Sequence, residues 1–463
     1  MMEQFNQSGG GDIAENTGIP LGTNYELRSP LNSLGCRGEN TPKSDQFSKI
    51  TGEISDLKYS PEATTIERYS LQKTACEILS TKHGKRDRTC TCLRTILSGA
   101  DGVLVKQSIK TKKCYYTNLM VCGSVWKCPL CNVKISESRA MEIGTAINCH
   151  VAVGGKVALL TFTVPHERHD DLKDMVKKLQ MAFARTWISP AAKRLKKSIG
   201  YVGYIRAKEV TWGFASGWHP HYHMLILYFS DKPEDEVNEL IKNEMFPVWQ
   251  NRCEKIGLGS PSYEHGLDVR GGKYAAEYIA KFDKPQKWGF EKELTKGQSK
   301  KSKVANRYGP YDLLREYKKT GSPNMARLFL EYCEGFHGSQ FVTWSVGLKD
   351  EYGVDDSVAK DKELAKTSDE ASKTLSEITP EDWKKIEFHH KRAEVIILAA
   401  KGWAVTQAFI NSLARPYKKK RKKAKPKLAK TSNVIAFKAS DKSVESLGKI
   451  TGDEWKKIAK GSK

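Results

Sequence analysis

The pattern of apolar and polar residues predicts three β-strands in the middle of the chain. Apolar residues alternate or cluster over short stretches bounded by polar turns, at 157–164, 200–211 and 221–229. In three neighbouring stretches they recur every three or four residues, as in a helix with one apolar face, at 170–187, 191–198 and 234–253. We therefore expect an α+β core within 85–350, with helices packed on one face of a sheet.

The segments on either side of this core have other patterns. Residues 1–60 are rich in Gly, Ser, Asn and Thr without a sustained period, so we expect them to be disordered. Thr379 and Pro380 are a helix-capping residue and a proline that favours a first helical turn, which predicts a small helical module over 379–413. Residues 418–463 form a basic tail that is either solvated or a nonspecific DNA clamp.

The charge of the chain favours a polyanionic partner. The 77 Lys and Arg residues exceed the 54 Asp and Glu residues, which gives a formal net charge of +23. Counterion release from phosphates favours nucleic acid, although proteins that bind ribosomes or anionic membranes share such a charge. No apolar run is long enough to cross a bilayer, and the first residues carry no export signal. We expect a soluble, cytoplasmic protein without a membrane partner.

Three of the eleven histidines lie within five residues, at the start of an apolar strand. Because alternate residues of a strand share a face, His221 and His223 project together and are typical of a metal-binding pair. Chance histidines on a surface strand are the alternative. A hairpin across 212–219 would bring Glu209 beside them and complete a three-sided site with open positions for a phosphate. Such a mixed N and O set suits Mg²⁺ or Mn²⁺ and would equally accept Zn²⁺.

A later stretch places two phenols and an amine on one side of a predicted helix. The four-residue spacing stacks Tyr274 above Tyr278, and Lys281 lies one turn beyond. An amphipathic helix that buries both rings would show the same spacing, but the His-x-His strand favours chemistry. The two motifs together predict that a metal ion polarises a scissile phosphate while a tyrosinate attacks in line. The product would be a phosphotyrosine, which keeps the bond energy for rejoining.

These motifs, in this order, resemble those of the HUH endonucleases. The matching segments are Ala158-Leu-Leu-Thr-Phe-Thr-Val-Pro165, Trp218-His-Pro-His-Tyr-His223 and Tyr278-Ile-Ala-Lys281. Within that superfamily the chain is most similar to the rolling-circle replication initiators of the pC194/pUB110 plasmid type, over about 90–350. The resemblance implies a central antiparallel sheet of the ferredoxin or RRM kind, carrying a tyrosine transesterase that nicks and rejoins one DNA strand.

The same resemblance assigns roles and partners. It implies that His221 and His223 are metal ligands, that Tyr278 is the nucleophile and that Lys281 assists it. It also implies single-stranded and origin DNA as substrates, and a host helicase and replication machinery as partners. The chain departs from the plasmid pattern at Tyr274, where those proteins commonly have a glutamate that activates water at termination. Two tyrosines resemble phage replication proteins and some transposases instead.

Two other functions fit parts of this pattern. An HUH tyrosine transposase of a mobile element would use the same chemistry, and inverted or subterminal repeats beside its gene would reveal it. A noncatalytic, zinc-dependent DNA-binding regulator would account for the charge and the cysteines, but the ordered histidine and tyrosine motifs argue against it. A conjugative relaxase usually carries its tyrosine ahead of the histidines, unlike this chain.

The cysteines predict a second metal site. In the cytosol thiols stay reduced, so clustered cysteines suggest a metal rather than disulfides. Cys128 and Cys131 form a Cys-x2-Cys half-site, and Cys122 lies shortly before them. The fourth ligand of a tetrahedral Zn²⁺ site is open among Cys90, Cys92 and Cys114, and Cys114 is our candidate. A set of buried thiols without metal is the alternative for this Cys-rich module at 90–131.

Overall fold

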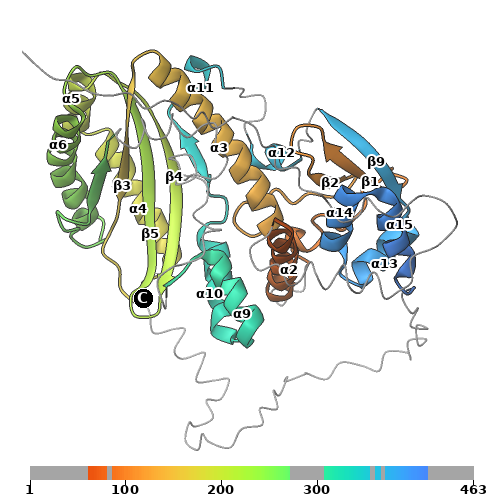
Figure 1. The fold of residues 1–463 in the computed structure, drawn as a ribbon. Helices are drawn as coiled ribbons and strands as arrows, with labels where there is room; N and C mark the ends of the chain where they lie inside the picture. Colours follow the sequence, from red (N-terminus) through yellow and green to blue (C-terminus); the bar gives the residue numbers. More distant parts are fainter. Residues whose placement is uncertain (1–60, 81–85, 272–306, 355–359, 367–370, 416–463) are drawn as a thin grey trace, which may run out of the picture. The chain divides into compact units, whose positions relative to one another are not determined.

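A computed structural model describes residues 61–80, 86–271, 307–354, 360–366 and 371–415. It contains two antiparallel sheets with helices packed against them, which confirms the predicted α+β class (Figure 1). The predicted disordered segment 1–60 and the basic tail 418–463 lie outside the described residues. Among the described helices, none has the length and apolar character needed to span a bilayer.

The larger sheet has the strand order β6-β3-β5-β4-β7, and β8 pairs with β4 on the same edge as β7. Every pairing in it is antiparallel. Its strands are β3 (Lys156–Phe162), β4 (Tyr201–Gly213), β5 (Gly217–Tyr228), β6 (Leu267–Arg270), β7 (Arg307–Tyr308) and β8 (Val342–Trp344). The three strands predicted from the apolar pattern are therefore confirmed as β3, β4 and β5, which lie side by side at the centre.

The three helices predicted beside these strands are also confirmed, and capping residues fix where the first two start. They are α4 (Leu172–Trp187), α5 (Pro190–Ser198) and α6 (Glu234–Lys255). The Asp171 carboxylate accepts a hydrogen bond from the Asp174 amide at 2.8 Å, and Ser189 caps α5 in the same way, with Pro190 in its first turn. Caps of this kind satisfy amides that no helical carbonyl can reach.

Helices cover both faces of the larger sheet, so the expectation of a single covered face is wrong. On one face, Phe162, Tyr222 and Met224 pack in a core with residues of α4 and α6, such as Phe183 and Trp249. On the other face lies α3 (Pro129–Ala152) (Figure 1), which packs against alternate strand residues. That second core joins Ile143 and Ile147 of α3 to strand residues that include Leu225 and Leu227. His221 and His223 share this face by strand periodicity, beyond the part that α3 covers.

The smaller sheet has the order β2-β1-β9 and joins distant parts of the chain. β1 (Val103–Ser108) pairs with β2 (Cys114–Thr117) and, on its other side, with β9 (Ser372–Ile378). One face packs on the three helices α13 (Pro380–Phe388), α14 (Arg392–Lys401) and α15 (Trp403–Ser412). These helices lie in the range predicted for a small helical module. Their core is shared with Val103, Val105 and Tyr116 of the hairpin.

The remaining helices complete the described fold. They are α2 (Pro61–Ser80), the short 3-10 helix η1 (Arg88–Cys90), α9 (Pro310–Thr320), α10 (Pro323–Gly335), α11 (Leu348–Glu351) and α12 (Asp361–Lys366). Buried Arg392 links three of these parts, because its guanidinium donates to Gln72 of α2 at 2.9 Å and to the Leu93 carbonyl at 2.9 Å. Gln72 in turn donates to the carbonyl of Cys92 at 2.8 Å. Helix α14 is thereby hydrogen-bonded, through α2, to the loop that carries Cys92.

Candidate active site and cysteine cluster

The structure brings Glu209, His221 and His223 together on one face of the β4–β5 hairpin. Glu209 is the direct partner of His221, and His223 lies opposite Ala207, because the strands turn within three residues between Gly213 and Gly217. A Glu209 carboxylate oxygen lies 3.3 Å from Nε2 of His223 and 3.9 Å from Nε2 of His221. Their potential ligand atoms all lie within 4.8 Å of one another. This group could hold a metal ion.

The burial of these three residues and the orientation of the two imidazole rings both suit metal binding. The relative exposures of Glu209, His221 and His223 are only 9%, 9% and 8%. Nδ1 of His221 lies 3.2 Å from the carbonyl of His219, and Nδ1 of His223 lies 3.1 Å from the Thr161 hydroxyl. In the tautomer that donates from Nδ1, each ring is held with Nε2 turned to Glu209. Hydrogen bonds of this kind commonly fix the imidazole ligands of metal ions.

His219 lies on the same face of β5 but does not belong to this group. Its ring stacks on that of His166, with centroids 4.5 Å apart and planes 10° from parallel. Burial, and then the neighbouring His221 and His166, lower the pKa of His219 to about 3. His219 is therefore neutral at neutral pH and adds no positive charge beside the two histidines that face Glu209.

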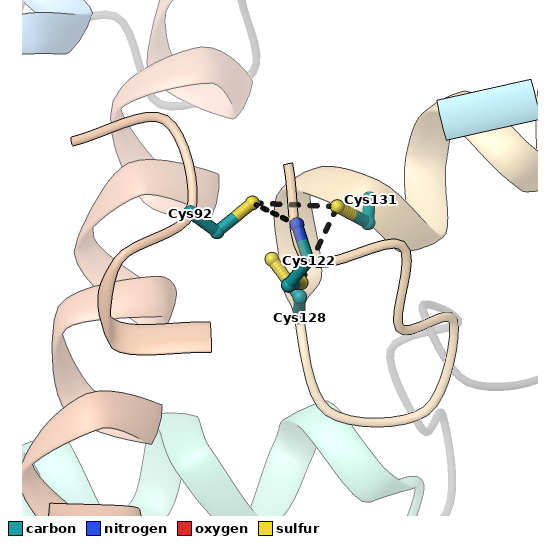
Figure 2. Close-up of side chains that lie close together, drawn as sticks. All are labelled: Cys92, Cys122, Cys128 and Cys131. Atoms are coloured by element: carbon teal, nitrogen blue, oxygen red, sulfur yellow. Dashed lines mark hydrogen bonds between the residues drawn. The ribbon is translucent and has the colours of Figure 1, made fainter. Parts of the chain in front are cut away.

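A second group consists of four buried cysteines, Cys92, Cys122, Cys128 and Cys131 (Figure 2). The sulfur of Cys131 lies 3.4 Å from that of Cys92 and 3.5 Å from that of Cys122. None of the four is in a disulfide. Four sulfurs at about 2.3 Å from a tetrahedral Zn²⁺ would lie about 3.8 Å from one another, close to the spacing seen here. This group, too, could hold a metal ion.

Cys114, our candidate for the fourth sulfur ligand, is not part of this group, and Cys92 takes its place. Cys114 begins β2, opposite Gln107, and its side chain packs on the core of the smaller sheet. Cys90, two residues before Cys92, turns away and contacts the Cys76 carbonyl in α2 at 3.7 Å. Cys92 faces the loop before α3, where it accepts a hydrogen bond from the Cys122 amide at 3.4 Å.

The thiols of the group shift one another's pKa. Hydrogen bonds from Cys128, Cys131 and Cys92 hold the pKa of the Cys122 thiol well below its ordinary value. Burial raises the pKa of Cys128, as do its sulfur neighbours. A thiolate supported by three other sulfurs in a buried pocket is what a soft divalent cation binds most strongly. The donor set therefore fits Zn²⁺ without further residues.

Comparison with known proteins identifies the family. The sequence model of a family described as "Replication protein" matches residues 116–394, which are 279 of the 463 residues. The chain belongs to this family. The match runs from β2 to α14 and includes the whole Glu209, His221 and His223 group and three of the four clustered cysteines.

Curated relatives of this replication protein come from bacteria. A "Protein rep" of Streptomyces lividans is 29% identical over 333 residues, covering 58% of this chain and 72% of that protein. A "Neomycin resistance protein" of Streptomyces cyanogenus is 37% identical over 169 residues, covering 30% of this chain and 39% of that protein. A "Protein rep" of Lentilactobacillus hilgardii is 26% identical over 125 residues, covering 27% of this chain and 38% of that protein. No solved structure matches the chain.

The predicted nucleophiles of the replication protein, Tyr274 and Tyr278, and the predicted helper Lys281 lie outside the described residues. Their roles stay predictions. Asp268 of β6 lies opposite Thr161, and Thr161 lies opposite His223, so the three residues form one row across the sheet. Tyr278 follows Asp268 by ten positions.

Thr161 was not predicted as a functional residue, and it gives a test of the metal group. We expect Thr161→Val to weaken Mn²⁺ binding by roughly 10- to 100-fold, because the ring of His223 loses the hydrogen bond that orients it. Titration of the metal-free protein, followed by the electron paramagnetic resonance signal of free Mn²⁺, measures this. Thr161→Ser keeps the hydroxyl and should bind like the wild type. Equal weakening in both variants would instead indicate a packing role for Thr161.

Proposed function

We propose that this replication protein initiates rolling-circle replication of a plasmid in the bacterial cytoplasm by nicking and rejoining one strand of origin DNA. The observation that carries this proposal is the buried group of Glu209, His221 and His223. Its two histidines and one carboxylate lie together on adjacent strands, with imidazole nitrogens 3.3 and 3.9 Å from the carboxylate. Membership in a replication protein family supports DNA as the substrate, and the net charge of +23 supports phosphate binding.

In this proposal the three residues hold Mg²⁺ or Mn²⁺. The ion, when bound, supplies Lewis-acid polarisation of the scissile phosphate. The phenolate oxygen of Tyr278 forms a bond to the phosphorus while the bond to the 3′-oxygen breaks, which leaves a 5′-phosphotyrosine. The 3′-oxygen takes up a proton from water and becomes a free 3′-hydroxyl. Lys281 stabilises the phenolate, because a positive charge nearby favours its ionised form. Tyr274 carries out a second strand transfer that closes the displaced circle.

We also propose that Cys92, Cys122, Cys128 and Cys131 bind a structural Zn²⁺. Four cysteine sulfurs with no position left for water are typical of zinc sites that stabilise a fold rather than catalyse a reaction. The cluster joins the loop at Cys92 to the start of α3, whose other end packs on the larger sheet. A host helicase and the replication machinery would act downstream of the nick.

A covalent adduct between the protein and DNA would test the proposal. We expect protein incubated with labelled single-stranded DNA from the surrounding replicon to form a covalent adduct with Mn²⁺, and none with EDTA. Peptide mapping should find the label on Tyr278. Tyr274→Phe should spare the first cleavage and impair the second transfer, whereas Tyr278→Phe should prevent both. In the predicted helix the residue three after Tyr274 is Glu277, whose charge would oppose ionisation of the Tyr274 phenol.

Three outcomes would change the proposal. Label found only on Tyr274 would reverse the order of the nucleophiles. Cleavage at inverted or subterminal repeats, but not at a plasmid origin, would indicate a transposase with the same chemistry. DNA binding without any adduct would indicate a noncatalytic regulator.

A further inference from the structure

The β1–β2 hairpin carries a group of lysines far along the sequence from the metal group. Its exposed loop, between Ser108 and Cys114, has the sequence Ile-Lys-Thr-Lys-Lys. Two more lysines lie on the adjoining strands. We call this set the hairpin lysines; they are Lys106, Lys110, Lys112, Lys113 and Lys373. Lys373 of β9 is the partner of Gln107, which brings it to the loop end of the hairpin.

Positive charge is segregated at this end of the smaller sheet. None of the hairpin lysines forms an ion pair within the described residues, whereas Lys178, Lys385 and Lys391 elsewhere each pair with a carboxylate at 2.7 to 2.8 Å. Glu377 lies at the opposite end of the sheet, beside Gly102 at the base of the hairpin. Lysines gathered at one tip repel one another, and an anionic partner would relieve this repulsion.

The loop has a fixed conformation rather than an extended one. The amide of Ser108 donates to the Lys113 carbonyl at 3.0 Å, and the amide of Lys112 donates to the Ser108 carbonyl at 3.0 Å. The Ser108 hydroxyl accepts from the Thr111 amide at 3.2 Å. On the outer side, the Ile109 amide donates to the Ala371 carbonyl at 2.9 Å. The backbone of the loop therefore has little conformational entropy left to lose on binding.

We propose that this hairpin is a binding arm for duplex DNA. A two-stranded β-ribbon fits the major groove, where lysines on either side reach the phosphates. At the tip, Ile109 is 56% exposed between these lysines and can contact base edges or a thymine methyl group. The loop between Ser108 and Cys114 has no aromatic ring, and the nearest one, Tyr115 opposite Lys106, is only partly exposed. Proteins that bind single strands stack the bases on such rings. Double-stranded DNA is therefore the ligand that the hairpin fits.

This inference rests on the proposed function only for the identity of the ligand as DNA. It assigns duplex binding to the smaller sheet and leaves strand cleavage to the larger one. Duplex binding and strand cleavage can be lost separately, since binding to a duplex requires neither the metal ion nor a tyrosine.

The test compares two triple variants of the full chain that remove the same charge. Lys110→Gln/Lys112→Gln/Lys113→Gln alters the hairpin, and Lys255→Gln/Lys318→Gln/Lys319→Gln alters exposed lysines on α6 and α9. Binding to a duplex of about 30 base pairs from the surrounding replicon is measured by fluorescence anisotropy in EDTA, between about 50 and 200 mM salt. Thermal unfolding of each variant checks that the fold is intact.

We expect the hairpin variant to bind the duplex at least about tenfold more weakly at 100 mM salt, and its plot of log Kd against log salt to be shallower by about 2 to 3. The control variant should differ from the wild type much less. Equal weakening in both variants would overturn the proposal, since any three lysines would then serve. Equal loss of affinity for a short single strand would also overturn it. Adduct formation on that strand, measured separately, reports on the nicking function and not on the hairpin.

Discussion

Replacing His223 with alanine is expected to reduce covalent adduct formation in Mn²⁺ by about three orders of magnitude or more. His223 has the imidazole nitrogen closest to Glu209, at 3.3 Å, so its loss leaves the ion one ligand short. An ion at a scissile phosphate is worth several kcal/mol in the transition state, and about 1.4 kcal/mol corresponds to a factor of ten. His221→Ala should act similarly. A labelled single strand and a denaturing gel measure the adduct.

DNA affinity should change little in the same variants, because it rests on many basic contacts. His219→Ala is the matched control: His219 lies on the same strand and face, but outside the metal group. It should retain adduct formation within about tenfold of the wild type, or roughly 1.4 kcal/mol. Undiminished cleavage by His221→Ala or His223→Ala, in either Mg²⁺ or Mn²⁺, would rule out the metal assignment.

The second large effect concerns zinc. We expect about one tightly bound zinc per chain, lost in Cys92→Ser and in Cys128→Ser/Cys131→Ser. Structural zinc sites commonly contribute many kcal/mol to folding. A loss of about 5 kcal/mol would lower Tm by about 10 to 20 °C in a domain of this size. Metal analysis of the purified protein, together with calorimetry, measures both quantities.

Cys114→Ser is the control that distinguishes the structure from the sequence-based expectation. Cys114 lies outside the cysteine cluster, so this variant should keep its zinc and most of its stability. If Cys114→Ser lost zinc and Cys92→Ser kept it, the cluster would not be the binding site. Unchanged melting of a zinc-free protein would show that the four sulfurs pack as ordinary buried thiols.

Local patterns were enough to predict the part of the fold that carries the metal group. The His-x-His spacing places both rings on one face because strand side chains alternate. The hairpin needed to bring Glu209 beside them turns within three residues, so its register follows from nearby sequence. Here local spacing determines spatial proximity.

The features that were missed depend on contacts between distant residues. Cys92 and Cys114 are comparable candidates by spacing, and only the direction in which the chain turns after η1 brings Cys92 to Cys131. The segment of β9, Ser-Lys-Thr-Leu-Ser-Glu-Ile, is too polar to indicate a strand, and it forms one by pairing with β1. Thr161 acquires its contact with His223 only when β3 lies beside β5.

The smaller sheet can be completed only late in the synthesis of the protein. Ile378, the last residue of β9, follows Thr117 of β2 by 261 positions. At about 5 to 20 residues per second, the ribosome needs roughly 15 to 50 s to supply the third strand after the first two have emerged. During that interval the core residues Val103 and Val105 lack both β9 and the helices that cover them. A nascent chain that stalls before Ser372 would expose this apolar surface to chaperones and proteases, although its β3–β4–β5 segment would be complete.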